Sequence, residues 1–322
     1  MTLPLGVTFD AFTDFGFWTS VGILAGTYVL FTLGLQLNVG YTGIVNFGQA
    51  GFMAIGAYAM GVLVVKAQWS FWLALPTAVF IAIGFGLLVG LPSLRLRADY
   101  FAIATIAAAE IVRITALNLR DVTGGNKGLF GFDESWNSLS DQIDSWLQSL
   151  GWSNPEQLFP LFIVVWVTAL IATTLLHFAT KSPWGRVLRA VREDEDAARA
   201  LGKNTLAYKL QSLAIAATLG ALAGFFVAIN LNFLTPEAFL PAFTFIGFAV
   251  LVLGGLASYW GVAAGAIIMW TILEGTRFID LPISAEREAA VRFMIVGLVL
   301  ILLMAFRPQG MFGKKEEMVL GE

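Results

Sequence analysis

Long apolar segments separated by short polar connections constrain this chain more than any other feature of its sequence. The hydrocarbon core of a bilayer requires about 20 apolar residues for each helical crossing. Only 13% of the residues are charged, about half the share in a typical soluble domain. The sequence therefore predicts an all-α, polytopic bundle of about nine transmembrane helices in a single domain, residues 1–322. The predicted spans are Trp18–Leu37, Gly43–Val65, Phe71–Leu91, Tyr100–Leu117, Leu158–Phe178, Leu210–Ile229, Phe239–Leu256, Trp260–Glu274 and Val291–Phe306.

Two of these spans contain glycine-rich points at which the helix could end. Gly48-Gln49 is a candidate break in the second span, and residues 254–261 leave little room for a turn between the seventh and the eighth.

Basic residues predict the orientation of the bundle, because Lys and Arg are enriched in cytoplasmic connections. With nine spans, the basic groups all fall on one side, which is therefore the cytoplasmic one. The N-terminus then lies outside, the C-terminus lies in the cytoplasm, and the acidic segment 120–157 forms an extracytoplasmic loop. The basic groups are Arg95 and Arg97, the insert 181–209, and Arg307, Lys314 and Lys315.

The insert 181–209 carries too many ionisable groups to lie in lipid. Ser182-Pro183 is a helix start, Glu195 and Arg199 are four residues apart, and Gly202 is a helix stop. The pattern predicts one short amphipathic helix at the membrane surface, open to a partner. The alternative is a solvated loop that only fixes topology. The apolar stripe of this helix is Val187, Leu188, Val191, Ala198 and Leu201.

Pairs of glycines four residues apart recur in the apolar segments. Small residues at this spacing let two helices approach closely in lipid, so the four pairs together favour a tight bundle. They are Gly22/Gly26, Gly86/Gly90, Gly220/Gly224 and Gly261/Gly265.

Polar side chains around the start of the second span are candidate residues of a solute pathway: Tyr41, Thr42, Asn46 and Gln49. Amide groups inside a span are costly unless they face protein or water, and they can bind a polar solute without a fixed charge. The alternative is that they form hydrogen bonds between helices.

Glu110 and Arg113 lie three residues apart in the fourth span, so each can neutralise the other. Such a pair either lines a wet pathway or meets another subunit, or else it is a structural ion pair that positions one helix.

The glycine-rich segment Thr123-Gly124-Gly125-Asn126 is followed by Lys127, so a phosphate-binding loop has to be considered. It lacks the GxxxxGK[ST] pattern and follows a membrane span, which argues against nucleotide binding and favours an outer gate or docking loop. With no cysteine and one histidine, His177, we expect no metal site and no catalytic residue in this chain.

Two functional hypotheses remain from the residues alone. One is a transport subunit driven through the insert by an external energy source. The other is a self-sufficient secondary transporter or channel, which should contain an intramembrane carboxylate for ion coupling; Glu110 is the candidate, although Arg113 holds it ionised. A membrane enzyme is a more distant third.

Five segments resemble one family, the M-type permease subunits of the branched-chain amino acid ABC importers. They are GYTGIVNFGQAGF (40–52), LRLRADYFAIATIAAAEIVR (94–113), TGGNKGL (123–129), GRVLRAVREDEDAARALG (185–202) and VLGGLASYWG (252–261). Asp196-Ala197-Ala198 followed by Gly202 is similar to the EAA–Gly coupling loop of import permeases. The resemblance implies a type II-like permease in which the insert is a coupling helix bound by an ATPase. The implied coupling residues are Arg186, Arg189, Arg192, Glu195, Asp196, Ala197, Ala198 and Gly202.

The same resemblance implies the partners and the location of the chain. They are an H-type permease, two ATPase subunits that bind the ATP and Mg²⁺, an extracytoplasmic solute-binding protein and the lipid of a bacterial inner membrane, with no cofactor in this chain and no nucleic acid. Family substrates are Leu, Ile, Val and other neutral amino acids, and related systems carry urea or short amides. The chain departs from the family at Gln49, where His is frequent, at Ala98 and at Asn126-Lys127, which leaves the solute open.

Overall fold

The computed structural model describes residues 14–152 and 156–276, with residues 291, 294, 295, 297, 298, 301, 302, 305, 306 and 310–313. Within these ranges the regular secondary structure is helical, with one isolated bridge between Leu129 and Leu234. The helices are α1 (Phe15–Leu35), η2 (Gln36–Thr42), α2 (Gln49–Val65), α3 (Phe71–Ser93), α4 (Ala98–Asn118), α5 (Arg120–Thr123), η3 (Gly125–Lys127), α6 (Glu134–Ser149), α7 (Phe159–Lys181), α8 (Pro183–Glu193), α9 (Glu195–Ala200), α10 (Thr205–Leu231), η4 (Pro236–Phe239), α11 (Ala242–Gly254) and α12 (Tyr259–Gly275).

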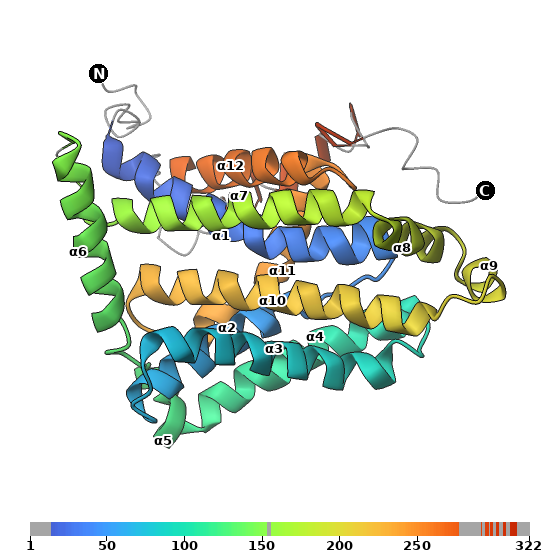
Figure 1. Ribbon diagram of the computed structural model, residues 1–322, viewed down its shortest axis with the longest axis horizontal. Helices are drawn as coiled ribbons and strands as arrows, with labels where there is room; N and C mark the ends of the chain where they lie inside the picture. Colours follow the sequence, from blue (N-terminus) through green and yellow to red (C-terminus); the bar gives the residue numbers. More distant parts are fainter. Residues whose placement is uncertain are drawn as a thin grey trace.

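The long helices lie side by side, with α6 across one end of the bundle and α8 and α9 at the other (Figure 1). The centre is formed by α1 and α10, most of whose residues are buried, whereas α3 and α4 are largely exposed at the periphery. Burial of α1 and α10 follows from their contacts, because α1 packs on α7, α10 and α12 while α10 packs on α1, α2 and α3.

The predicted spans are only partly confirmed. Five helices are long and apolar enough to cross a membrane: α1 continued by η2, α3, α4, α7 and α10, each within a few residues of its predicted bounds. The pair α11 and α12 adds a sixth crossing if its two bent halves are counted as one. The ninth predicted span, Val291–Phe306, lies largely outside the described residues.

The prediction of a second span that is helical from Gly43 is wrong for its first six residues. Residues 43–48 are not helical, and α2, with 17 residues, begins only at Gln49. Gly43 has a left-handed backbone (φ 75°), which ends η2, and Asn46 Oδ1 accepts a hydrogen bond from the Gly48 amide at 2.8 Å. The chain therefore reaches the start of α2 through residues 43–48, which have no regular secondary structure and which we call the non-helical segment.

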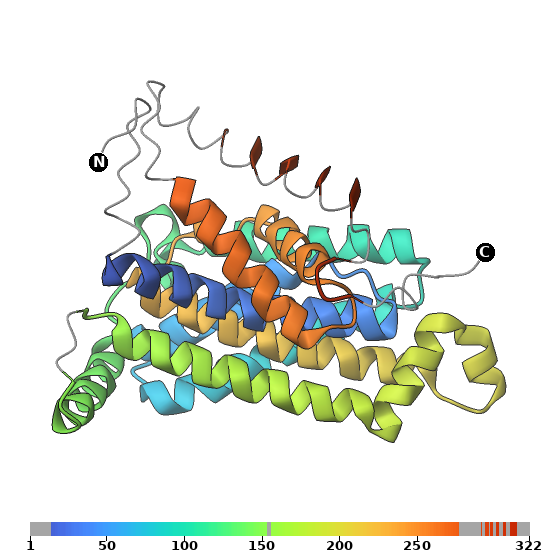
Figure 2. The same cartoon turned by 90° about the horizontal axis from the view of Figure 1, so that it is seen from above.

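The seventh and eighth predicted spans become two short helices that meet at an angle of 117°. Gly255, with φ 103°, lies in the corner between them. A side chain on Gly254 would overlap the main chain of Gly261, so the two helices touch backbone to backbone. In the view from above, α12 crosses over the bundle obliquely (Figure 2).

The glycine pairs predicted from their spacing do lie at helix contacts. A Cβ on Gly22 would overlap Phe162, and one on Gly224 would overlap the Met53 carbonyl. Gly22 therefore leaves space for an aromatic ring of α7, and at Gly224 the main chains of α10 and α2 approach too closely for a larger residue.

The insert forms two helices where the sequence predicts one. Asp194 is extended (φ −153°) and separates α8 from α9. Its Oδ1 accepts hydrogen bonds from the amides of Asp196 and Ala197, both at 2.9 Å, which starts the second helix. The predicted stop at Gly202 is confirmed by its left-handed φ of 76°. Leu201 does not continue the apolar stripe, because 80% of it is exposed.

Candidate functional site

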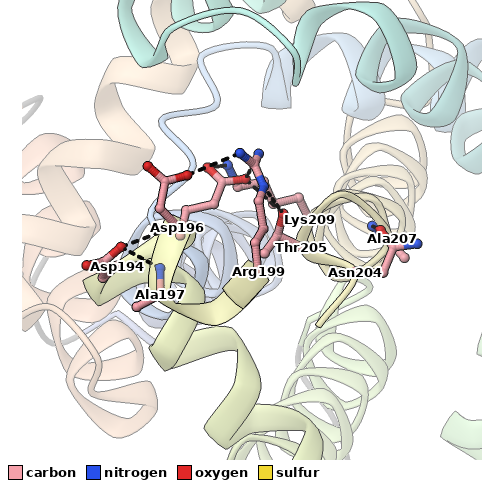
Figure 3. A network of polar contacts seen from close by, with 9 residues as sticks. Asp194, Asp196, Ala197, Arg199, Asn204, Thr205, Ala207 and Lys209 are labelled. Atoms are coloured by element: carbon pink, nitrogen blue, oxygen red, sulfur yellow. Dashed lines mark hydrogen bonds and ion pairs between the residues drawn. The ribbon is translucent and has the colours of Figure 1, made fainter. Parts of the chain in front are cut away.

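A network of charged groups fixes α9 to the start of α10 (Figure 3). Glu195 accepts hydrogen bonds from Arg199 at 2.7 Å, Lys209 at 2.5 Å and Thr205 at 3.0 Å. Burial alone would raise the pKa of the Glu195 carboxyl. The bonds and charges of Lys209, Thr205 and Arg199 outweigh burial, so the pKa lies below its ordinary value. The α8–α9 element is therefore held as one piece on the end of the bundle.

The inner side of α8 contacts the turn before the non-helical segment. Arg192 donates a hydrogen bond to the carbonyl oxygen of Gly40, and the Arg189 guanidinium lies 5.4 Å from the ring centroid of Tyr41. The Tyr41 hydroxyl donates to the carbonyl of Ala257 at 3.0 Å, and its ring stacks on Tyr259. These contacts join α8, η2 and the α11–α12 corner.

The predicted coupling residues consequently divide into two groups. Arg189, Arg192 and Glu195 contact the bundle, and Ala198 is buried. The second group is exposed and consists of Arg186, Asp196, Ala197 and Gly202. The neighbouring Leu201 is exposed as well. The sequence predicts Leu201 in the apolar stripe, whereas the structure exposes it at the end of α9.

Threonine hydroxyls from other helices bind the amides at the start of α2. The Phe47 amide donates to Thr105 Oγ1 and the Ala50 amide to Thr244 Oγ1, both at 3.1 Å. Sequence reasoning missed these two residues, because a threonine in an apolar span usually bonds to its own helix. The Ala50 amide in the first turn of α2, and the Phe47 amide just before this helix, are thus satisfied by side chains of other helices.

The predicted pathway residues near the second span are buried inside this chain. Gln49 Nε2 donates to the carbonyls of Phe31 at 3.2 Å and Ala216 at 3.0 Å, which joins α1 to α10. Thr42 Oγ1 donates to Ser212 Oγ at 2.8 Å. Tyr41, Thr42, Asn46 and Gln49 are all 5% exposed or less. In this conformation Thr42 and Gln49 form bonds between helices. Asn46 instead binds Gly48 and Gln49, close by in the chain.

Glu110 and Arg113 lie apart from that group, on the partly exposed surface of α4. Their side chains form an ion pair at 2.5 Å and are 36% and 17% exposed, respectively. Glu237 of η4, which sequence reasoning did not single out, interacts electrostatically with Arg113. The structure therefore separates the predicted pathway residues into a buried group and a surface pair.

The predicted outer gate or docking loop is a closed turn at the end of the bundle opposite to α8 and α9 (Figure 1). It consists of Thr123, Gly124, Gly125 and Asn126. Thr123 Oγ1 donates to the carbonyls of Ala116 and Leu119 at 2.5 and 2.8 Å. The bridge between Leu129 and Leu234 then ties the following residues to the connection after α10.

This architecture, with apolar spans, a non-helical segment inside the bundle and a charged element at one end, is that of a polytopic helical membrane protein. Residues 18–304 match the family described as the permease component of the branched-chain amino acid transport system, and the chain belongs to that family.

Known relatives cover most of the chain. It is 32% identical over 301 residues to the Escherichia coli high-affinity branched-chain amino acid transport system permease protein LivM, covering 90% of this chain and 69% of that protein. It is 25% identical over 332 residues to a probable LivM of Methanocaldococcus jannaschii, covering 90% and 91%. The permease protein LivH of Escherichia coli is 26% identical over 307 residues, covering 91% and 93%. No solved structure matches this chain.

Proposed function

We propose that this permease subunit serves an ATP-driven importer of branched-chain or other neutral amino acids, and that separate ATPase subunits drive it through α8–α9. The observation that carries the proposal is the α8–α9 element itself. It protrudes from one end of the bundle, is bound firmly to α10 through Glu195, and exposes Asp196, Ala197 and Leu201. ATP and Mg²⁺ bind to the partner ATPases, whose closure moves α8–α9 and rocks the bundle between two access states.

The orientation that a nine-span, type II-like topology implies has support from the distribution of charge along the bundle. Arg97 lies beside α8 and α9, whereas the acidic loop with α6 lies at the other end (Figure 1). The end with α8 and α9 is cytoplasmic by the positive-inside rule, so the chain enters a bacterial inner membrane with its N-terminus outside. The C-terminal basic residues lie outside the described part of the chain.

A second, H-type permease completes the membrane part of the importer. LivH proteins match 91% of this chain, which supports two permeases of one fold with the solute path between them. The surface of α4 with Glu110 and Arg113 faces that partner, because a charged pair is costly against lipid. An extracytoplasmic binding protein delivers solute at the end with α6.

A disruption of the exposed tip tests the ATPase interaction. Leu201→Asp should abolish co-purification of the ATPases and ATP-driven uptake, while the permease stays in the membrane. Leu150→Asp is the matched control, because Leu150 is 64% exposed at the opposite end. Full ATPase binding by Leu201→Asp would contradict the assignment of α8–α9.

Uptake measurements distinguish the alternatives for energy source and substrate. In vesicles that contain the permeases without ATPases, a proton gradient should drive no leucine uptake; uptake there would establish a secondary transporter. With the full complex, leucine should be transported in preference to urea or a short amide.

A further inference from the structure

A cavity of about 310 Å³ opens between three parts of the chain at the end of the bundle with α8 and α9. Its walls are residues 42–45 at the beginning of the non-helical segment, the connection from α3 to α4, and the facing sides of α8, α9 and α10. The cavity thus lies between the element that we assign to ATPase coupling and the start of the interrupted second span.

Positive charge dominates the lining of this cavity. Arg97, Arg192 and Lys209 contribute three cationic groups, against the single carboxylate of Glu195. Glu195 already binds Lys209 and Arg199, so its charge is compensated. Arg97 is exposed and makes no side-chain hydrogen bond or ion pair within the described part of the chain. The cavity therefore favours an anionic ligand and offers it an uncommitted guanidinium.

The cavity lies at a membrane–water boundary, next to the ends of three spans. Arg97 directly precedes α4, Leu94 directly follows α3, and Lys209 belongs to the second turn of α10. Leu96 lines the cavity and is 51% exposed, so an apolar side chain borders the charged groups. A lipid headgroup at this depth meets the cations while its acyl chains remain along the exposed faces of α3 and α4.

We propose that this cavity binds the phosphate group of an anionic phospholipid from the leaflet on the α8–α9 side. Arg97 is its main contact, and Arg192 and Lys209 contribute further positive charge. The bound headgroup bridges the α3–α4 connection to α8. This proposal goes beyond transport, and it can be tested on the permease alone, without ATPase or uptake.

Native mass spectrometry of the purified, delipidated full-length permease tests the site with phosphatidylglycerol and phosphatidylcholine of identical acyl chains. Wild-type protein should retain phosphatidylglycerol preferentially. Arg97→Gln should weaken that retention on the order of five-fold, as expected for the loss of one cation near an anionic headgroup. Arg97→Lys should keep most of it.

Arg95→Gln is the matched control, because Arg95 belongs to the same connection and does not line the cavity. It should bind both lipids as the wild type does. Equal retention of the two lipids by wild-type protein, or unchanged retention by a folded Arg97→Gln variant, would overturn the proposal. So would displacement of the lipid by millimolar inorganic phosphate, which indicates a free-anion site, or by millimolar leucine, which indicates a solute site.

Discussion

Arg192, at the end of α8, donates a hydrogen bond to the main-chain carbonyl of Gly40, 152 residues earlier in the chain. Gly43 lies close to the same arginine, so that even a Cβ there would touch the Arg192 side chain. The charged α8–α9 element is therefore attached directly to the turn that precedes the non-helical segment. A movement of α8 reaches this segment without passing through the long spans.

Replacing Arg192 tests this attachment. Arg192→Gln should leave the Gly40 carbonyl without its partner, at a cost of about 1–3 kcal/mol in the free energy of unfolding. ATP hydrolysis by the assembled complex should continue while leucine uptake falls, which simultaneous assays in proteoliposomes would reveal. For stability, Arg186→Gln is the control, since Arg186 is exposed on the same helix. Unchanged uptake per ATP would argue against transmission through this contact.

The lowered pKa of Glu195 predicts a pH-dependent contribution to stability. A carboxyl whose pKa lies below its ordinary value of 4.5 in the folded protein stabilises the fold above that value. This contribution is lost as the pH falls below 4.5 through the lowered pKa. Thermal unfolding should show the wild type more stable than Glu195→Gln by about 1 kcal/mol at pH 7. The difference should disappear under acidic conditions.

Glu193→Gln provides the comparison for that experiment, because Glu193 is exposed and has no ion pair within the described residues. A constant difference between wild type and Glu195→Gln at all pH values would show that the ionised carboxylate does not stabilise α9.

Gln49 should matter for stability more than for solute selection. It is fully buried and joins α1 to α10 through two hydrogen bonds. Gln49→Leu should destabilise the permease by about 1–3 kcal/mol in thermal unfolding, with little change in the relative uptake of leucine and valine. An unchanged melting temperature with altered substrate preference would place Gln49 in the solute path.

Replacing glycine by alanine should have different effects on stability at two positions in the spans. Gly224→Ala forces a methyl group onto the Met53 carbonyl and should cost about 1–3 kcal/mol or more. Gly84→Ala, on α3, meets nothing within 4 Å and should be neutral or slightly stabilising. The test is to compare the melting temperatures of the two purified variants in the same detergent. Equal melting temperatures would mean that α10 and α2 are not in close contact.

The ion pair on α4 can be tested by charge exchange. Glu110→Gln leaves Arg113 without its bidentate partner and should impair assembly with the second permease. The double variant Glu110→Arg with Arg113→Glu should restore assembly, as measured by co-purification. If assembly returns and uptake does not, the charges act on the solute as well.

The long spans could be predicted from the sequence because their physical requirement is local. The helices α3, α4, α7 and α10 need only enough consecutive apolar residues, and their predicted bounds are close to the observed ones. The candidate break at Gly48-Gln49 is confirmed, because α2 begins at Gln49. That residues 43–48 are not helical at all depends on distant groups: they are apolar enough to continue a span, but the Phe47 amide binds Thr105, 58 residues along the chain.

The candidate site, like the fold, could be predicted only where its contacts are local in the sequence. The ion pairs Glu195–Arg199 and Glu110–Arg113 follow from helical spacing, and both are present. The break at Asp194 could not be anticipated, since a run of acidic residues is compatible with one continuous helix until the Asp194 side chain caps the next turn. The contact of Tyr41 with Ala257 requires the fold itself.

The non-helical segment is held by a few separate hydrogen bonds instead of a helical ladder. Backbone bonds in a continuous helix form cooperatively, whereas in this segment the Phe47 amide binds the Thr105 hydroxyl and the Gly48 amide binds the Asn46 side chain. Each such bond is worth about 1 kcal/mol net, not far above thermal energy. These bonds can therefore break separately from those of the surrounding spans, next to the turn that Arg192 of α8 contacts.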